Sequence, residues 1–451
     1  MISSFLIIIQ GYYMFNSEKN EKKITYTLDA LVKTGSFQIA SDTDAGLYDR
    51  IKGIEISSKV LAEIEGRVST IGVTSEFKKV IDTFKPAAGI TPAGFRHELR
   101  FGGDKSLRID LKRDIAFMEN SVRRPTNVLF SANTANPFEV MSVRKLIANL
   151  TTNPQIIYSN FLNNPNANVG NQFRDRFEVL NELKNLVGPG VDISVELNDP
   201  FADKVAMMEE IAQFEEVLSR YQLVVKVPHT GPINSENVKD FLAGKYGSYD
   251  QGASKDFFYG HNLAYELQEK GYRVNFTLMA EPHQTALALL AKPYFINAFV
   301  QRRYDQTQKM ASLLNKLDET GDTIYEEEIH DFMKKADMIS SDDINLKAAV
   351  EKARILVDYR NADLSGKDDG LDSVRHSLRV LKTANLPDTR LIVCNMKTAE
   401  MYYDLDRMVT EPEFADMKQR VIITCEPEYF AQFTASPTIY CYQRSFLNSV
   451  K

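Results

Sequence analysis

A lysine inside a run of apolar residues is the first candidate for chemistry in this chain. Lys226 belongs to the segment Tyr221-Gln-Leu-Val-Val-Lys-Val-Pro-His-Thr230, which predicts a short, fully buried strand. Burial of a lysine disfavours its charged form. A neutral amine can attack a carbonyl and form a Schiff base. The alternative is a lysine whose stem is buried while its ammonium group reaches solvent at the strand end.

Other apolar runs of the chain also carry polar residues at one end. These residues are Asn133 and Thr134; Thr151, Thr152, Asn153 and Pro154; Glu196; Thr230; Asn275 and Thr277; and Asn297 with Arg302 after it. Each alone has an ordinary interpretation, since a strand-end glutamate is usually a surface residue and Asn before Pro favours a turn. Together with Lys226 they provide one amine, one carboxylate and several small polar groups.

Eight short apolar runs, separated by amphipathic stretches, follow from about residue 126. The runs are Val128–Ala132, Lys145–Leu150, Val191–Leu197, Leu223–Val227, Arg273–Leu278, Tyr294–Val300, Leu391–Cys394 and Val421–Cys425. Helical patterns at Val205–Tyr221 and at His261–Lys270, with Gly271 as a C-terminal cap, lie between them. Alternating strands and helices predict a parallel sheet, and eight units predict an α/β fold of the (β/α)8 TIM-barrel type. Catalytic groups of such barrels project from the C-terminal ends of the strands.

Two segments fall outside this alternation. Residues 1–125 are interpreted as an N-terminal accessory region, with a strand at Phe37–Ala40 and a helix over Leu47–Glu65. Residues 304–388 have helical patterns only and hold 12 Lys+Arg against 18 Asp+Glu. We expect an acidic helical insertion here, between the sixth and seventh strands. The barrel would then comprise 126–303 (strands 1–6) and 389–451 (strands 7 and 8).

Part of the insertion also has the composition of a calcium-binding loop. Asp318–Glu328 begins and ends with acidic residues and has Ile324 near its centre. It is one residue too short and lacks the turn glycine after Asp322. We therefore prefer a plain acidic loop between two helices.

The composition of the chain bears on its partners and its cellular compartment. The 451 residues have a net charge of −7 and no basic cluster, which argues against nucleic acid as a partner. Three cysteines without zinc-ligand spacing favour a reducing compartment and no metal. The apolar run Phe5–Ile9 is too short to span a membrane and lacks a signal-peptide pattern. We expect a soluble cytoplasmic protein with no membrane partner, and a homo-oligomer is compatible with the sequence.

The candidate groups together define a mechanism. A neutral lysine adds to a ketose carbonyl, and the resulting iminium accepts the electrons of a breaking C–C bond. A carboxylate with a bound water moves the protons. An arginine after the sixth strand could hold a sugar phosphate, because guanidinium and phosphate pair bidentately.

The order of these segments resembles transaldolase and its smaller relative fructose 6-phosphate aldolase, the class I Schiff-base aldolases. Thr151-Thr152-Asn153-Pro154 matches the family's Thr-Thr-Asn-Pro on strand two. Val191–Leu197 is similar to the strand that carries the catalytic glutamate, and Val224-Val-Lys-Val-Pro228 to the strand that carries the Schiff-base lysine. The resemblance implies catalytic roles for Lys226 and Glu196, and substrate binding by Thr152 and Asn153.

Two further segments extend the resemblance across about 126–303. Gly271-Tyr-Arg-Val-Asn-Phe-Thr-Leu278 resembles the family's Gly-Ile-x-x-Asn-x-Thr-Leu, so Asn275 would bind substrate and Thr277 would assist proton transfer. Phe295–Arg302 resembles Ile-Ser-Pro-Phe-Val-Gly-Arg, so Asn297 would line the site and Arg302 would bind the phosphate.

Several positions depart from the family pattern. Asn133 stands where the family has a proton-transferring aspartate, and an amide cannot take up a proton. Gln155 replaces a serine, Asn297-Ala298 replaces Ser-Pro, and Gln301 replaces a glycine. We keep Asn133 among the candidate catalytic residues because of its position.

The resemblance implies an enzyme that transfers or releases a dihydroxyacetone unit of a ketose phosphate, such as fructose 6-phosphate or sedoheptulose 7-phosphate. It implies a place in carbohydrate metabolism, and no cofactor, because the lysine supplies the electron sink. The alternative is a catalytically impaired barrel that binds sugar phosphates or acts as a scaffold, which Asn133 favours. His229 is either an acid/base near neutral pH or, by preference, a strand-end histidine without a catalytic role.

Overall fold

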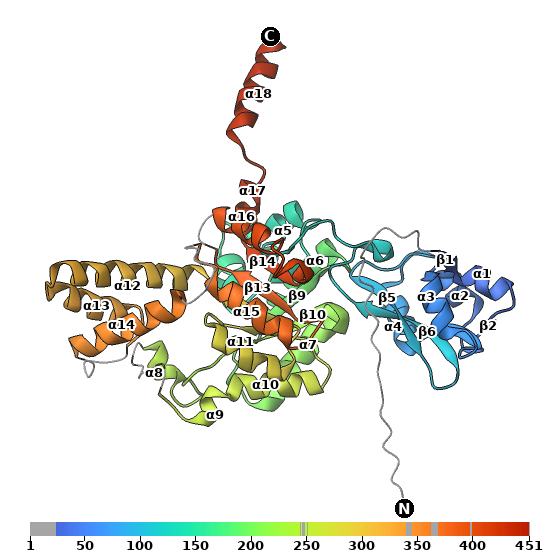
Figure 1. Cartoon of the computed structure of the whole chain (residues 1–451), viewed down its shortest axis with the longest axis horizontal. Coiled ribbons are helices and arrows are strands. Elements are labelled where there is room, and N and C mark those ends of the chain that lie inside the picture. Colours follow the sequence, from blue (N-terminus) through green and yellow to red (C-terminus); the bar gives the residue numbers. More distant parts are fainter. Residues whose placement is uncertain are drawn as a thin grey trace, which may run out of the picture. The chain divides into compact units, whose positions relative to one another are not determined.

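The computed structural model describes residues 24–243, 245, 249, 251–339, 345–361, 369–396 and 399–450. The described chain divides into two compact units (Figure 1). One is formed by residues up to 90 together with 97–111, and the other by 91–96 and everything from 112 onward. The expected accessory region ended at residue 125, so the structure assigns 112–125 to the unit that contains the barrel.

The first unit contains two small sheets and four helices. An antiparallel pair is formed by β1 (Thr25–Thr27) and β3 (Glu55–Ser57). The second sheet has the order β2 (Gln38–Ile39), β4 (Thr70–Val73), β6 (Ser106–Arg113), β5 (Phe95–Phe101). The helices are α1 (Leu28–Lys33), α2 (Ala45–Ile51), α3 (Ser58–Ile64) and α4 (Ser75–Phe84).

One expected helix of this unit is divided. The pattern over Leu47–Glu65 predicted one continuous helix, but β3 separates α2 from α3. The Ser57 side chain accepts a hydrogen bond from the Val60 amide and so begins a new helix. The expected strand at Phe37–Ala40 corresponds to β2.

The second unit is built on a closed barrel of eight parallel strands, which confirms the predicted (β/α)8 fold. The strands are β7 (Leu129–Asn133), β8 (Asn149–Thr151), β9 (Asp192–Glu196), β10 (Leu223–Pro228), β11 (Val274–Thr277), β12 (Phe295–Phe299), β13 (Arg390–Cys394) and β14 (Val421–Cys425). Each pairs in parallel with its neighbour along the chain, and β14 pairs with β7 to close the ring.

Helices follow the strands, and most of them cover the outside of the barrel. They are α5 (Pro137–Val143), a π-helical segment (Gln155–Leu162), α6 (Arg176–Val187), α7 (Lys204–Gln222), α8 (Val238–Leu242), α9 (Ser254–Phe257), α10 (Tyr259–Glu269), α11 (Pro282–Ala288), α15 (Asp372–Thr383), α16 (Ala399–Met408), α17 (Pro427–Gln432) and α18 (Pro437–Ser449). Gly271 follows α10 with a φ of 80°, the left-handed conformation that glycine adopts without strain, as the sequence predicted.

Helix α10 packs unusually close to the strand that carries Lys226. A Cβ atom on Gly260 would lie 2.2 Å from the carbonyl oxygen of Pro228. Glycine at this position therefore lets the helix approach the end of β10 directly.

Strand alternation divides the barrel residues into two sets. Outward side chains such as Val225, Val227 and Phe276 form one core with the surrounding helices. Inward side chains such as Leu129, Val224, Phe295, Ile392 and Ile422 form a second core inside the barrel. Polar residues at inward positions therefore face one another across the interior.

Buried ion pairs lie at the N-terminal ends of the barrel strands. Asp192 is fully buried and lies 2.7 Å from a guanidinium nitrogen of Arg113 and 2.7 Å from one of Arg273. Asp114 accepts from Arg390 at 2.5 Å and from Arg96 at 3.2 Å. Residues of the segment before the barrel therefore supply partners for charges on β9 and β13.

Three helices between β12 and β13 form a separate bundle. Helices α12 (Gln301–Thr320), α13 (Ile324–Lys335) and α14 (Leu346–Asn361) lie side by side (Figure 1). Their core contains Met310, Leu313, Ile329, Met333 and Ala349.

The fourth helix of the expected insertion belongs to the barrel. Helix α15 packs against α11, β12 and β13. The insertion predicted over 304–388 therefore includes one helix of the barrel's outer layer, and α12 already begins at Gln301.

The acidic segment of the insertion has no calcium-loop geometry. Asp318 lies in α12 and forms an ion pair with Arg354 of α14. Helix α12 ends at Thr320, Gly321 is left-handed, and α13 begins at Ile324. The structure thus agrees with the preferred interpretation, a turn between two helices.

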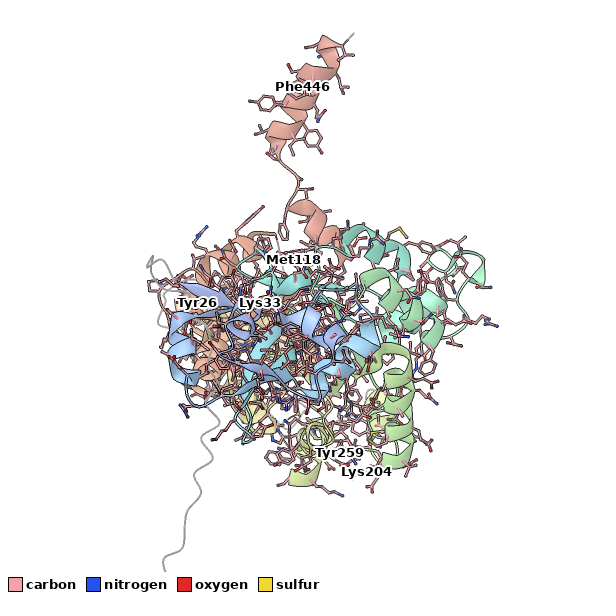
Figure 2. All side chains as sticks on the ribbon, turned by 90° about the vertical axis from the view of Figure 1, so that its right-hand side faces the viewer. Tyr26, Lys33, Met118, Lys204, Tyr259 and Phe446 are labelled. Carbon is pink, nitrogen blue, oxygen red and sulfur yellow. The ribbon has the colours of Figure 1, made fainter. Side chains whose placement is uncertain are left out.

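Helix α18 is the most exposed helix of the second unit. None of its described residues is buried, and Ile439, Tyr440, Tyr442, Phe446 and Leu447 are exposed, as Phe446 in Figure 2 illustrates. In the part of the chain that the structure describes, no helix is both long and apolar enough to cross a membrane.

Candidate active site

Lys226 lies at an inward position of β10 and is 6% exposed. Its Nζ lies 2.9 Å from Oε2 of Glu196 and donates a hydrogen bond to the carbonyl oxygen of Thr152 at 3.0 Å. The amine is therefore inside the barrel, and the alternative of an ammonium group in solvent is wrong.

Strand register explains why these groups meet. Lys226 pairs with Glu196 of β9 on one side and with Asn275 of β11 on the other. Paired residues on neighbouring parallel strands point to the same face. The amine, the carboxylate and the amide are therefore adjacent.

The Thr-Thr-Asn-Pro segment shapes the site mainly through its backbone. The amide and the hydroxyl of Thr152 both donate to the carbonyl oxygen of Ser194, at 2.9 and 3.1 Å. This arrangement leaves the Thr152 carbonyl to accept from Lys226. The Asn153 side-chain oxygen accepts from the Ile156 amide at 2.8 Å and so begins the helical segment that follows.

A chain of buried polar side chains, here called the polar belt, runs around the barrel interior below Lys226. Its members are Ser131, Asn149, Ser194, Asn275, Asn297 and Cys394. Asn149 donates to Ser131 at 2.8 Å and accepts from Ser194 at 3.1 Å. Asn275 donates to Ser194 at 3.3 Å and accepts from Asn297 at 2.5 Å.

The polar belt contains two residues that the sequence analysis predicted for the site and four that it did not. Asn275 and Asn297 contact each other, whereas Ser131, Asn149, Ser194 and Cys394 were not singled out from the sequence. The signal that could have found them is the alternation within each strand, since they share the inward parity of Glu196, Lys226 and Asn275. Burial raises the pKa of Cys394 to about 12, so this thiol stays protonated near neutral pH.

Two threonines complete the inward face at this level. Thr277 is 3% exposed at the end of β11, and its carbonyl oxygen accepts from the His229 amide. Thr424 of β14 is in register with Ser131, and its buried hydroxyl has no hydrogen-bond partner among the described residues.

Asn133 ends β7 at the C-terminal mouth of the barrel. Its Nδ2 donates to Oε1 of Glu426, the residue that follows β14, at 2.8 Å. The position where the resemblance implied an aspartate is thus occupied by an amide bonded to a carboxylate from the neighbouring strand.

Arg302 lies at the start of α12 and points away from the polar belt. Its side chain is 70% exposed, and Nη2 lies 3.5 Å from Asp337 of the helical bundle. The neighbouring Arg303 is the buried one, and it pairs with Glu281 and Asp372. Glu281 also pairs with Arg360 of α14, so these charges connect the bundle to the barrel. Phosphate binding by Arg302 stays a prediction.

His229 lies on the outer side of the barrel wall. Its ring centre is 4.4 Å from that of Phe276, an outward residue of β11. Burial lowers the pKa of His229 to about 4, and the nearby His261 and His283 contribute in the same direction. The side chain is therefore neutral near pH 7, which agrees with the preferred interpretation of a histidine without a catalytic role.

The pKa of His229 predicts a pH dependence of stability. Because its pKa is about 4 in the folded chain against 6.5 as the reference value, the unfolded chain binds more protons between these limits. The contribution of neutral His229 to the stability of the folded chain is fully present above about pH 6.5, and it is lost as pH falls toward 4. We expect the free energy of unfolding to fall more steeply over this range in the wild type than in His229→Asn, measured by urea denaturation. Parallel curves would contradict the expectation.

The fold and the site together define a (β/α)8 barrel with a buried lysine paired to a carboxylate at the C-terminal ends of adjacent strands. The sequence model of the transaldolase/fructose-6-phosphate aldolase family matches residues 134–439, more than half of the chain. The chain belongs to this family of transaldolase-like aldolases, and it is an enzyme at that general level. A search of curated proteins finds no match.

Proposed function

We propose that the chain transfers or releases a dihydroxyacetone unit of a ketose phosphate through an imine on Lys226. The observation that carries the proposal is the position of the Lys226 Nζ, buried in the barrel and 2.9 Å from the Glu196 carboxylate. A lysine amine needs a base to remove its proton before it attacks a carbonyl, and a carboxylate at this distance can serve.

The proposed reaction begins with addition of the amine to the ketose carbonyl. Glu196 takes a proton from Nζ and, with a water, returns one to the carbinolamine hydroxyl, which leaves as water. The iminium then accepts the electrons of the adjacent C–C bond, and an aldehyde departs. Transfer of the remaining three-carbon enamine to another aldehyde gives transaldolase activity, and its hydrolysis gives aldolase activity.

Neighbouring side chains have proposed roles in binding. Asn275 and Thr277 lie beside Lys226 on β11 and would hold substrate hydroxyls, with Thr277 also passing protons. Arg302 would hold the phosphate after exchanging its partner Asp337 for the ligand. Fructose 6-phosphate and sedoheptulose 7-phosphate are the proposed donors.

Borohydride trapping tests the imine directly. We expect incubation with dihydroxyacetone or fructose 6-phosphate, followed by borohydride, to add the mass of the reduced ketose to the peptide that contains Lys226. A Lys184→Met protein is the matched control, because the partly buried Lys184 donates to the Val217 carbonyl outside the barrel interior and should not affect labelling.

The same experiment separates the proposal from its main rival. The presence of Asn133, where the family has an aspartate, favours a barrel that binds sugar phosphates without turnover. Absence of any adduct, or an adduct on another lysine, would contradict the proposed imine and support that rival. An adduct on Lys226 without product formation would restrict the activity to imine formation.

A further inference from the structure

A second carboxylate stands at the C-terminal mouth of the barrel, across from Lys226. Glu426 directly follows β14, and in the ring of eight strands β14 is four neighbours away from β10. Of the described residues that end a barrel strand or come directly after one, Glu196 and Glu426 are the two carboxylates. Glu196 is engaged by Lys226, and Glu426 is not.

The backbone directs Glu426 toward the interior. Its φ of −65° and ψ of 150° continue the extended conformation of β14, in which Thr424 faces the polar belt. Residues two apart in an extended chain point to the same side. Glu426 therefore follows Thr424 on the inward side, at the level of the mouth, where it is exposed to solvent.

Asn133 fixes the orientation of this carboxylate. Its Nδ2 donates to Oε1 at 2.8 Å, and among the described residues Oε2 has no hydrogen-bond partner. An amide NH2 group donates to one carboxylate oxygen and leaves the other oxygen available as a hydrogen-bond acceptor. Asn133 thus holds in place a carboxylate that follows the adjacent strand.

We propose that Glu426 is the general base for cleavage of the C–C bond in the imine. The inference rests on the proposed function and assigns its second proton transfer. Glu426 takes the proton of the hydroxyl on the far carbon of the breaking bond, the carbon β to the iminium. The C–O bond of that hydroxyl becomes the carbonyl of the departing aldehyde, and the electrons of the C–C bond move into the iminium to give an enamine. Glu196 then serves imine formation, and Glu426 serves cleavage.

Three variants test this assignment with fructose 6-phosphate as the probe. Glu426→Gln should keep borohydride labelling of Lys226 within about twofold and lose product formation by about 10²-fold or more, the usual effect of removing a general base. Glu428→Gln, the same charge change two residues later on the exposed face of α17, should match the wild type in both. The exchange variant Asn133→Asp/Glu426→Gln moves the carboxylate to β7 and should recover at least tenfold of the loss.

Each other result overturns the assignment. Unchanged product formation in Glu426→Gln would show that the carboxylate is not the base. Parallel loss of labelling and turnover would indicate a structural role, and failure of the exchange variant to recover activity would exclude a transferable carboxylate. A wild-type protein that gives no adduct would instead overturn the proposed function, so the two failures are distinguishable.

Discussion

Replacement of Lys226 by methionine should abolish turnover of fructose 6-phosphate while the fold is retained. Methionine has a similar length and tolerates the buried position, which is 6% exposed in the native chain. Without the amine no imine forms, and loss of the nucleophile in a covalent mechanism costs about 10⁴-fold or more. Product release by a coupled assay and the thermal unfolding midpoint provide the two measurements.

The control for this prediction is Lys184→Met, which removes a partly buried lysine from the outer layer of the barrel. It should keep wild-type turnover. Activity of the Lys226→Met protein above one tenth of the wild type would rule out the imine at this position. If the wild-type protein is already inactive and the Lys226→Met protein still binds a sugar phosphate, the results would favour the binding role.

Replacement of Asp192 by asparagine should strongly destabilise the fold. Asp192 is fully buried and accepts from Arg113 at 2.7 Å and from Arg273 at 2.7 Å. Asparagine has nearly the same shape but carries no charge, so two buried guanidinium groups lose their counter-ion. Removing one partner of a buried ion pair costs about 3–5 kcal/mol.

Urea denaturation of Asp192→Asn beside Asp331→Asn gives the measurement. Asp331 lies on α13 with a side chain that is 71% exposed, so its replacement should change the unfolding free energy by less than about 0.5 kcal/mol. A loss below about 1 kcal/mol for Asp192→Asn would mean that the arginines find other partners.

The strands of the barrel could be predicted because each carries a local signal. Short apolar runs separated by helical patterns predicted all eight strands, although the second run, Lys145–Leu150, was placed four residues ahead of β8. The contact between Lys226 and Glu196 depends on the register of adjacent strands. Resemblance to a family supported that contact more than any local pattern did.

Other parts of the site depend on long-range geometry that the sequence does not encode locally. Arg302 and Arg303 are adjacent on one helix, so about 100° of rotation separates an exposed side chain from a buried one. Glu426 lies about three hundred residues from Asn133, and only closure of the ring by β14 and β7 brings them together. The insertion boundary was misplaced because α15 has the same periodicity as the helices of the bundle.

The buried charges beneath the barrel have a consequence for how this chain can be divided or recombined. Arg113 and Asp114 precede the first barrel strand by about fifteen residues, yet they neutralise Asp192 on β9 and Arg390 on β13. A fragment cut at residue 126 would hold every strand, yet it would leave Asp192 with Arg273 alone and would remove Asp114 from Arg390. A barrel fragment meant for fusion to another N-terminal partner must therefore include Arg113 and Asp114, which lie ahead of its first strand.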